Sequence, residues 1–205
     1  MGRGNLPKWA IEDPLKFWKM ADVAERSNGA AYREHRIALP NELTLEQQHE
    51  LVDLLISDIA GEKPFHYAVH GPRAALGTER NTHLHLVQSD RVPDGIEREP
   101  EQTFRRYNPH DPTKGGCRKD SGGRTRMEVR DAMIRTRKAI ADAQNHVLAK
   151  YGHDERVDHR SLKAQGKKKK AEKHLGPARI RTMGDEGRKL YRAAREAGKA
   201  LQQDH

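Results

Sequence analysis

Apolar residues at helical spacing predict two helices near the start of the chain. Asp13 followed by Pro14 has the form of an N-cap and first helical position, and apolar side chains then recur at helical intervals as far as Ser27. Thr44 and Gln47 form a capping box in front of a second apolar stripe. We therefore expect one helix from Pro14 to Ser27 and a second helix that begins after Thr44.

Alternation of apolar and polar residues predicts three strands, over residues 31–39, 65–70 and 82–88. In the first of these strands, Tyr32, Glu34 and Arg36 share one face. The other two strands are separated by a loop that contains glycine and proline, so we expect them to pair as an antiparallel hairpin.

The second half of the chain changes character. Residues 89–123 are rich in Asp, Pro, Gly and Arg and predict an extended surface loop. Helical periodicity returns over 127–151 with a basic outer side, and a lysine run then precedes a solvated helix over 186–202. We expect a domain over residues 1–165 and a basic, partly helical or disordered appendage over 166–205.

Composition narrows the partners and the compartment. Hydrophobic residues make up only 34% of the chain, and Lys and Arg outnumber Asp and Glu by 39 to 30, which gives a net charge of +9. Such a surplus favours nucleic acid, and less strongly an acidic membrane surface. No apolar run approaches the roughly 20 residues of a membrane-spanning helix, and Met1 to Asn5 has no stretch typical of a secretory signal. A single cysteine, Cys117, excludes an internal disulfide framework, so we expect a cytoplasmic protein without a membrane partner.

Three histidines form a candidate metal site. His83 and His85 lie two residues apart on a predicted strand, so their side chains project from one face. His70 ends the preceding strand and can approach the same point if the two strands pair. Three neutral imidazoles leave coordination positions open, as in a catalytic metal site. The alternative is a mixture of surface and core histidines, because the chain contains 12 histidines in all.

Several motifs occur in an order that carries a resemblance. They are Arg33 to Leu43, Ala68 to His70, Asn81 to His85, Asp94 to Arg98, Phe104 to Asn108, Gly115-Gly116, Gly152 to Asp154 and Asp158 to Leu162. Over roughly residues 13–166 this order resembles the MobA/MobL family of plasmid mobilisation relaxases.

The resemblance implies an α+β fold of the histidine-hydrophobe-histidine (HUH) relaxase type, with an antiparallel sheet, helices packed on one side and a metal on the central strands. Family members are metal-dependent endonucleases that nick and close one DNA strand at a transfer origin during conjugation, and they stay joined to the 5′ phosphate through a tyrosine. The resemblance implies a divalent metal, Mg²⁺ or Mn²⁺, on His70, His83 and His85. Glu34 matches an acidic residue near the site, which orients a ligand or helps to deprotonate the nucleophile. The implied partners are single-stranded or origin-of-transfer DNA and other relaxosome proteins.

The nucleophile departs from the family pattern. The family's tyrosine precedes the segment that matches Asp13, and the twelve residues before Asp13 contain no tyrosine. We therefore expect a shortened N-terminus that lacks the usual nucleophile. Tyr32 is the candidate substitute, because it shares a strand face with Glu34. The alternative is that Tyr32 is an aromatic residue packed beside the first helix.

A basic, glycine-rich segment is the candidate DNA surface. Cationic side chains interleaved with aromatic rings suit single-stranded DNA through phosphate contacts and base stacking, although a charge cluster is often only a solvated surface. The predicted contact residues are Arg105, Arg106, Tyr107, Arg118, Lys119 and Arg124. Two functions follow: a relaxase domain that binds metal and origin DNA for strand nicking, or a noncatalytic basic DNA-binding protein with a structural metal or no metal.

Overall fold

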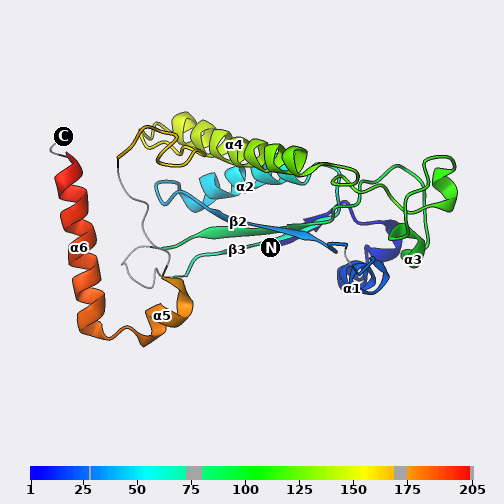
Figure 1. Cartoon of the computed structure of the whole chain (residues 1–205), viewed down its shortest axis with the longest axis horizontal. Helices are drawn as coiled ribbons and strands as arrows, with labels where there is room; N and C mark the ends of the chain where they lie inside the picture. Colours follow the sequence, from blue (N-terminus) through cyan, green and yellow to red (C-terminus); the bar gives the residue numbers. More distant parts are fainter. Residues whose placement is uncertain (28, 73–79, 169–174, 204–205) are drawn as a thin grey trace. The chain divides into compact units, whose positions relative to one another are not determined.

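A four-stranded antiparallel sheet forms the centre of the first part of the chain, in the order β1-β3-β4-β2 (Figure 1). The computed structural model describes residues 1–27, 29–72, 80–168 and 175–203. The strands are β1 (Gly2–Gly4), β2 (Arg33–Ala38), β3 (Phe65–His70) and β4 (His83–Gln88). The predicted hairpin is confirmed, since β3 and β4 pair along their whole length, from His70 opposite His83 to Phe65 opposite Gln88.

Two helices cover one face of this sheet, α2 (Leu45–Ile59) and α4 (Arg126–Lys150) (Figure 1). The capping box predicted for α2 is present, with the Thr44 hydroxyl accepting from Gln47 N and the Gln47 side chain accepting from Thr44 N. Thr125 and Glu128 form the same arrangement at the start of α4. The caps satisfy backbone N–H groups that have no partner within the helix.

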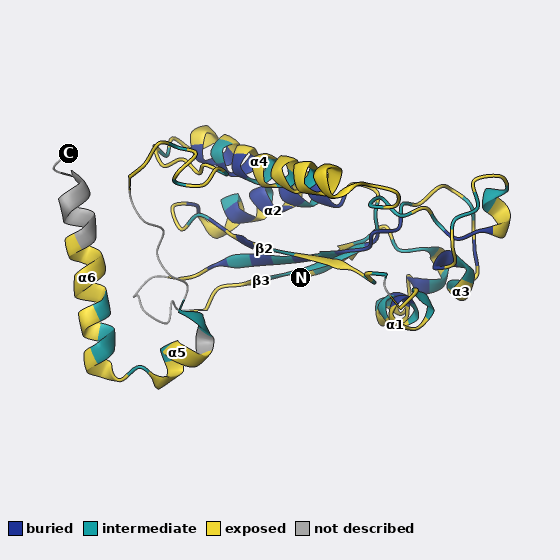
Figure 2. Ribbon diagram, in the orientation of Figure 1, coloured by how far each residue is buried: buried dark blue, intermediate teal, exposed yellow. Residues whose placement is uncertain are grey.

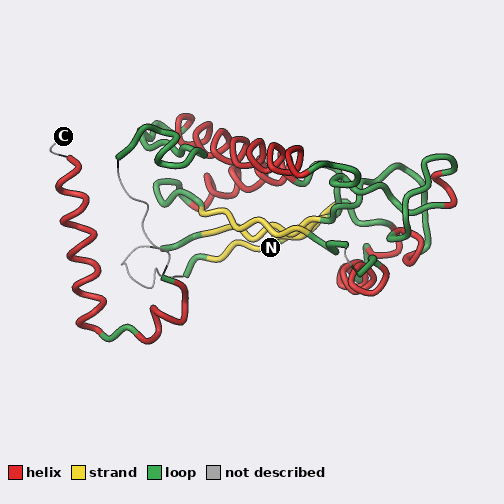
Figure 3. Tube along the Cα trace, viewed as in Figure 1, coloured by secondary structure: helices red, strands yellow, loops and turns green. Residues whose placement is uncertain are grey.

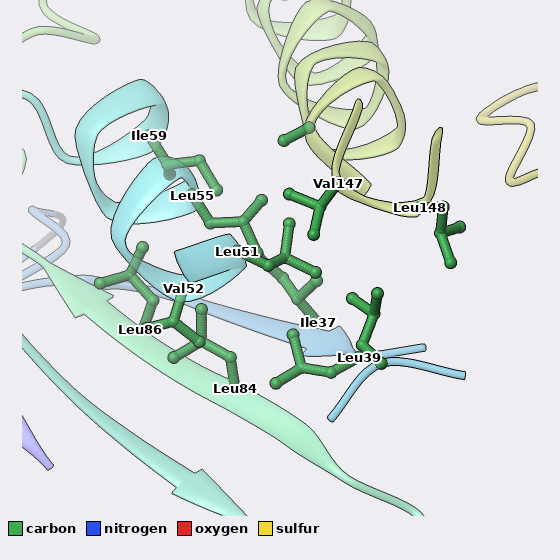
Figure 4. Close-up of a cluster of buried hydrophobic side chains, with 12 residues drawn as sticks. Ile37, Leu39, Leu51, Val52, Leu55, Ile59, Leu84, Leu86, Val147 and Leu148 are labelled. Carbon is green, nitrogen blue, oxygen red and sulfur yellow. The ribbon is translucent and has the colours of Figure 1, made fainter. Parts of the chain in front are cut away.

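The main hydrophobic core lies between these helices and the sheet. Leu51 and Leu55 from α2 meet Leu84 and Leu86 from β4, and none of the four is exposed (Figure 4). Burial of each such side chain stabilises the fold by about 1.5–3 kcal/mol. Figure 2 shows that buried residues line the inner sides of α2 and α4, whereas the outer side of α4 is exposed.

The ends of two predicted elements were wrong by a few residues. Helix α1 spans Pro14–Ala24 and is capped by Asp13 as predicted, but it ends before Ser27 because the backbone at Glu25 becomes extended. The strand predicted over 31–39 is the shorter β2.

Strand β1 was not predicted, because Gly-Arg-Gly has low strand propensity. It pairs with β3, with Arg3 opposite His66. Asn5 then turns the chain with a positive φ of 57°, and its side-chain amide donates to Gly61 O at 2.6 Å.

Residues 89–123 form a loop with few regular elements, as predicted, but the expectation that this loop lies at the surface was wrong. This segment has few regular elements (Figure 3), among them α3 (Pro100–Thr103), yet it encloses buried residues. Phe104 packs against Phe17 of α1, with ring centroids 5.3 Å apart. Arg91 is buried and donates to the carbonyls of Arg105, at 2.9 Å, and of Cys117, at 2.6 Å. A buried guanidinium therefore organises backbone that would otherwise need a sheet or water to satisfy it.

The chain consists of two compact units. The first comprises residues 1–70 and 82–159, and the second comprises residues 71–81 and 160–205. In the second unit, the helix predicted over 186–202 is present as α6 (Asp185–Gln203), preceded by α5 (Gly176–Thr182). The predicted boundary at residue 166 stays a prediction, and Lys169 and Lys170 lie outside the described residues. Among the helices of the described residues, none has the length and apolar character needed to cross a membrane.

Candidate functional site

The register of the hairpin brings the three predicted histidines together. His70 lies directly opposite His83, and His85 follows two residues later on the same face of β4. The ring centroids are 5.8 Å apart for His70 and His83, 5.1 Å for His70 and His85, and 4.8 Å for His83 and His85. This histidine cluster lies on the sheet face opposite α2 and α4, because its residues alternate with the buried Leu84 and Leu86.

The spacing of the rings fits a shared cation, but the orientation of their ligand atoms does not complete a site. Three imidazoles that hold one tetrahedral ion at about 2.1 Å have centroids roughly 5 Å apart. Within the residues that the structure describes, no group of three or more His, Cys, Asp or Glu side chains is arranged to hold a metal ion as it stands. Rotation about χ2 redirects the ring nitrogens with little displacement of the ring centre, and this torsion has broad preferences. The strands therefore determine the ring spacing, and side-chain rotation would have to complete the coordination.

Glu34 contacts the cluster from the neighbouring strand. Its Oε1 lies 2.7 Å from His85 Nδ1, and Arg36 Nε donates to the same oxygen at 3.2 Å. With Nδ1 protonated toward the carboxylate, the lone pair of His85 is on Nε2, which is the nitrogen then available to a cation. Hydrogen bonding from His85, and more weakly the contacts with Arg36, hold the pKa of the Glu34 carboxyl below its ordinary value, against the opposing effect of burial. Glu34 is therefore a charged acceptor that can orient His85.

Tyr32 lies away from this cluster. Its ring packs edge to face on Trp18 of α1, with centroids 6.3 Å apart. His85 lies opposite Arg36 of β2. Tyr32 precedes Arg36 by four residues, which is about 13 Å at the rise of a strand. The contact of Tyr32 with Trp18 corresponds to the alternative stated above, an aromatic residue packed beside the first helix.

Sequence reasoning missed the neighbours that organise this face. Trp18 also packs edge to face on His66, with centroids 5.0 Å apart, which joins α1 to the histidine side of the sheet. Arg36 was noted only as a face partner of Glu34. Its alternation on the strand could have signalled the ion pair, whereas no pattern in the sequence indicated the contact between Trp18 and His66.

Four of the six predicted DNA-contact residues line one basic pocket of about 340 Å³, whereas Arg105 and Arg124 lie outside it. It is lined by Arg26, Arg91, Arg106, Tyr107, Arg118, Lys119 and Gly122. Arg106 and Arg118 are exposed, and Tyr107 is half-buried beside them. The pocket thus combines cationic side chains with one aromatic ring, as the segment's composition predicted.

The glycines of this segment permit a close approach of backbone. A Cβ at Gly115 would lie 2.4 Å from Asn108 N, and one at Gly116 would lie 2.3 Å from Arg105 O. Gly116 N also donates to Arg106 O at 3.2 Å. The segment that carries Arg105 and Arg106 lies so close to Gly115 and Gly116 that no larger residue fits at either glycine.

Two of the predicted contact residues already have acidic partners. Lys119 Nζ lies 2.9 Å from Glu25 Oε2 in a nearly buried ion pair and donates to Ala30 O at 3.1 Å. Arg124 Nη2 lies 2.6 Å from Asp120 Oδ1 at the surface. Lys119 therefore stabilises the segment itself, while Arg105, Arg106 and Arg118 remain exposed at the surface.

Comparison with known proteins gives a family match over most of the chain. The model of the MobA/MobL family matches residues 2–184. The chain is 43% identical over 164 residues to a 43 kDa relaxation protein of Salmonella typhimurium, covering 80% of this chain and 44% of that protein. It is 40% identical over 176 residues to Mobilization protein A of Escherichia coli, covering 85% of this chain and 23% of that protein. The chain therefore spans less than half the length of these two relatives.

A more distant relative and a solved structure agree with this match. Mobilization protein MobL of Acidithiobacillus ferridurans is 28% identical over 219 residues, covering 96% of this chain and 55% of that protein. A chain from the structure "Molecular Basis of Vancomycin Resistance Transfer in Staphylococcus aureus" aligns with a TM-score of 0.53 at 24% identity, covering 78% of this chain and 73% of that chain. At this identity the structural likeness supports the α+β fold alone.

Proposed function

We propose a function for this chain from one established premise: it belongs to the MobA/MobL family of plasmid mobilisation relaxases. The chain acts as the part of a relaxase that binds single-stranded DNA of a transfer origin and presents a phosphodiester to a divalent cation for strand nicking. The observation that carries this proposal is the contact of three imidazoles from two paired strands, with Glu34 bonded to one of them.

The cation would be held by His70, His83 and His85. A divalent ion supplies Lewis-acid polarisation of a phosphoryl oxygen when bound. In this scheme Glu34 orients the His85 ring through Nδ1, and Arg36 keeps the carboxylate charged through its own contact with Oε1. Mg²⁺ and Mn²⁺ are the ions that we expect.

DNA would be held by the basic pocket. Arg106 and Arg118 offer guanidinium donors for phosphate oxygens, and the Tyr107 ring offers a surface for a base. The net charge of +9 favours the same partner at longer range. Other relaxosome proteins are expected as partners in the cell.

One observation favours a second candidate, in which this chain binds DNA and metal but does not cut by itself. Tyr32 packs on Trp18 and lies about 13 Å along the strand from the level of His85. A tyrosine that attacks phosphorus must reach the phosphate beside the cation, in line with the leaving oxygen.

A titration with Mn²⁺ tests the metal proposal. Calorimetry on the full chain should give one site per chain, and His83→Ala should weaken the affinity by at least about 100-fold, because one of three ligands is lost. His110→Ala is the matched control, since His110 is exposed in a loop. Equal binding by the wild type and His83→Ala would exclude the cluster as the metal site.

A nicking assay separates the two functions. Supercoiled plasmid that carries the cognate origin is incubated with the chain and Mn²⁺, and relaxed product joined to protein is measured on a denaturing gel. Joined product that disappears in Tyr32→Phe would establish Tyr32 as the nucleophile. Metal and DNA binding without any relaxed product would favour the second candidate.

Binding of single-stranded DNA tests the basic pocket. Arg118→Ala should reduce affinity several-fold and lower the slope of log affinity against log salt by about 0.7, the value for one phosphate contact on a single strand. Arg137→Ala, at an exposed position on α4, should leave both quantities nearly unchanged. Identical salt slopes for Arg118→Ala and the wild type would remove Arg118 from the interface.

A further inference from the structure

Three aromatic side chains lie on the same sheet face as the histidine cluster. Trp18 of α1 packs edge to face on His66 of β3 and on Tyr32, with ring centroids 5.0 Å and 6.3 Å away. His66 points to this face because its neighbours on β3, Phe65 and Tyr67, pack against the main core. Trp18, Tyr32 and His66 are called the aromatic group below, and the proposed function gives them no role in binding.

The strand register places the aromatic group close to the histidine cluster. His66 precedes Ala68 by two residues, and Ala68 lies opposite His85. Two residues of a strand rise about 7 Å, which is roughly two phosphate steps along one strand of B-DNA. Ala68 lies between His66 and His70 on this face and carries only a methyl group, so it presents little obstacle to a ligand that lies across the sheet.

The aromatic group also adjoins the basic pocket. Lys119, which lines that pocket, donates to Ala30 O at 3.1 Å. Ala30 precedes Tyr32 by two residues, so their Cα atoms are at most about 7 Å apart. The aromatic group therefore links the candidate phosphate-binding side chains to the candidate metal site, and a DNA strand that contacts both passes over it by the shortest route.

The rings are accessible to a ligand and have a cationic neighbour. Tyr32 is 51% exposed, and Trp18 and His66 are half-buried. On β1, the exposed Arg3 lies opposite His66. Glu34, an acidic residue on the same face, is already bonded to the histidine cluster. Exposed aromatic rings beside cationic side chains are the features by which proteins bind the bases of single-stranded nucleic acid.

We infer that the aromatic group stacks one base of the DNA strand whose phosphates contact the basic pocket and the candidate metal site. This inference rests on the proposed function, because the ligand is the same DNA strand. Stacking at this point holds the strand between its two phosphate contacts and so positions the phosphodiester at the histidine cluster. Because every base has an aromatic face, the stacking adds affinity without selecting a sequence.

Tyr32 gives the sharpest test, because it is exposed and its truncation leaves no cavity in a core. The ratio of affinities for a 20-nucleotide thymidine oligonucleotide and a 20-unit abasic oligonucleotide measures the contribution of bases at a constant number of phosphates. Tyr32→Leu should lower this ratio by about 5-fold or more, the loss of one stacked base. Tyr32→Phe keeps the ring and should leave the ratio unchanged.

Tyr151→Leu is the matched control, since Tyr151 is 39% exposed at the end of α4 and belongs to neither proposed site. It should bind both oligonucleotides as the wild type does. A ratio that is equal in Tyr32→Leu and the wild type would overturn the inference.

Tryptophan emission locates the base. The chain has only two tryptophans, Trp9 and Trp18. The thymidine oligonucleotide should quench the emission of the wild type, and the quenching should be lost in Trp18→Phe, whose emission comes from Trp9 alone. The abasic oligonucleotide should quench neither protein. Equal quenching of the two proteins, or no quenching of the wild type when anisotropy shows saturation, would contradict stacking on the aromatic group.

Failure of this inference can be told apart from failure of the proposed function. If neither oligonucleotide binds the wild type, the DNA-binding proposal itself is wrong. If both bind and Tyr32→Leu leaves the ratio unchanged, DNA binding stands and the aromatic group does not take a base. Circular dichroism of each variant checks that the fold is retained.

Discussion

On β4, neighbouring residues have opposite surroundings. Leu84 and Leu86 are fully buried beneath the helices, whereas His83 and His85 are only half-buried on the other face. Alternate residues of β4 point to the two faces, and the whole strand is hydrogen-bonded to β2 on one side and to β3 on the other. The two sets of side chains therefore differ only in what lies above them.

This difference separates stability from chemistry. The helix face is closely packed, so any loss of volume there leaves a cavity that the fold cannot fill. The histidine face carries polar rings at the surface of the sheet, where a side chain can be replaced without a cavity. We therefore expect substitutions on one face to change unfolding and substitutions on the other face to change ligand binding.

The largest effect is expected from Leu86→Ala, which should lower the free energy of unfolding by about 2–5 kcal/mol. Leu86 is completely buried against the core, so the truncation loses contacts as well as transfer free energy. Urea unfolding followed by circular dichroism measures this change. The fraction that remains folded should bind Mn²⁺ as the wild type does.

Val87→Ala is the matched control for Leu86→Ala. Val87 is the next residue on the same strand but lies half-buried on the histidine face, opposite Glu34. It should cost about 1 kcal/mol or less. Equal losses for the two variants would contradict the division between a stabilising face and a ligand-binding face.

The next effect concerns the contact between Glu34 and His85. Glu34→Gln keeps the shape of the side chain but loses the charge that fixes the tautomer of His85, and should weaken Mn²⁺ affinity by about 10- to 100-fold. Glu42→Gln, at an exposed acidic residue just beyond β2, is the control. Affinity that is equal in both variants would mean that Glu34 does not orient a ligand.

The hairpin and the helix caps could be predicted from the sequence because their signals are local. The alternation over residues 65–70 and 82–88 predicts which side chains share a face, and the hairpin then places His70 opposite His83. Thr44 and Gln47 act within one helical turn. The histidine cluster follows from the same local rules, since two strands that pair antiparallel bring their alternate residues to one face.

The segment over residues 89–123 could not be predicted because its core depends on distant partners. Because Arg91 is charged, the sequence indicated a surface position. Arg91 is instead buried in an ion pair with Glu25 at the end of α1, with Arg91 Nε 2.7 Å from Glu25 Oε1. No periodicity reports such an ion pair. The contact of Glu34 with His85 likewise joins residues far apart in sequence, and only the family resemblance indicated that Glu34 lies near the site.

The smallest effect compares two histidines on opposite faces, His35 and His66. Burial lowers the pKa of both, and the nearby Lys63 and Arg33 lower that of His35 further. A histidine with a depressed pKa is held neutral in the folded state, so its contribution to stability is complete above its unfolded value of 6.5 and is lost as pH falls below that value. We therefore expect the free energy of unfolding to fall as the pH is lowered from about 7.5 to about 5.5.

His35→Gln should reduce this pH dependence more than His66→Gln, because only His35 lies near cations on the helix face. Urea unfolding at the two pH values measures the change for each variant. His110→Gln, at an exposed loop position, should retain the pH dependence of the wild type. A larger reduction in His66→Gln than in His35→Gln would show that the histidine face, and not the helix face, makes folding sensitive to acid.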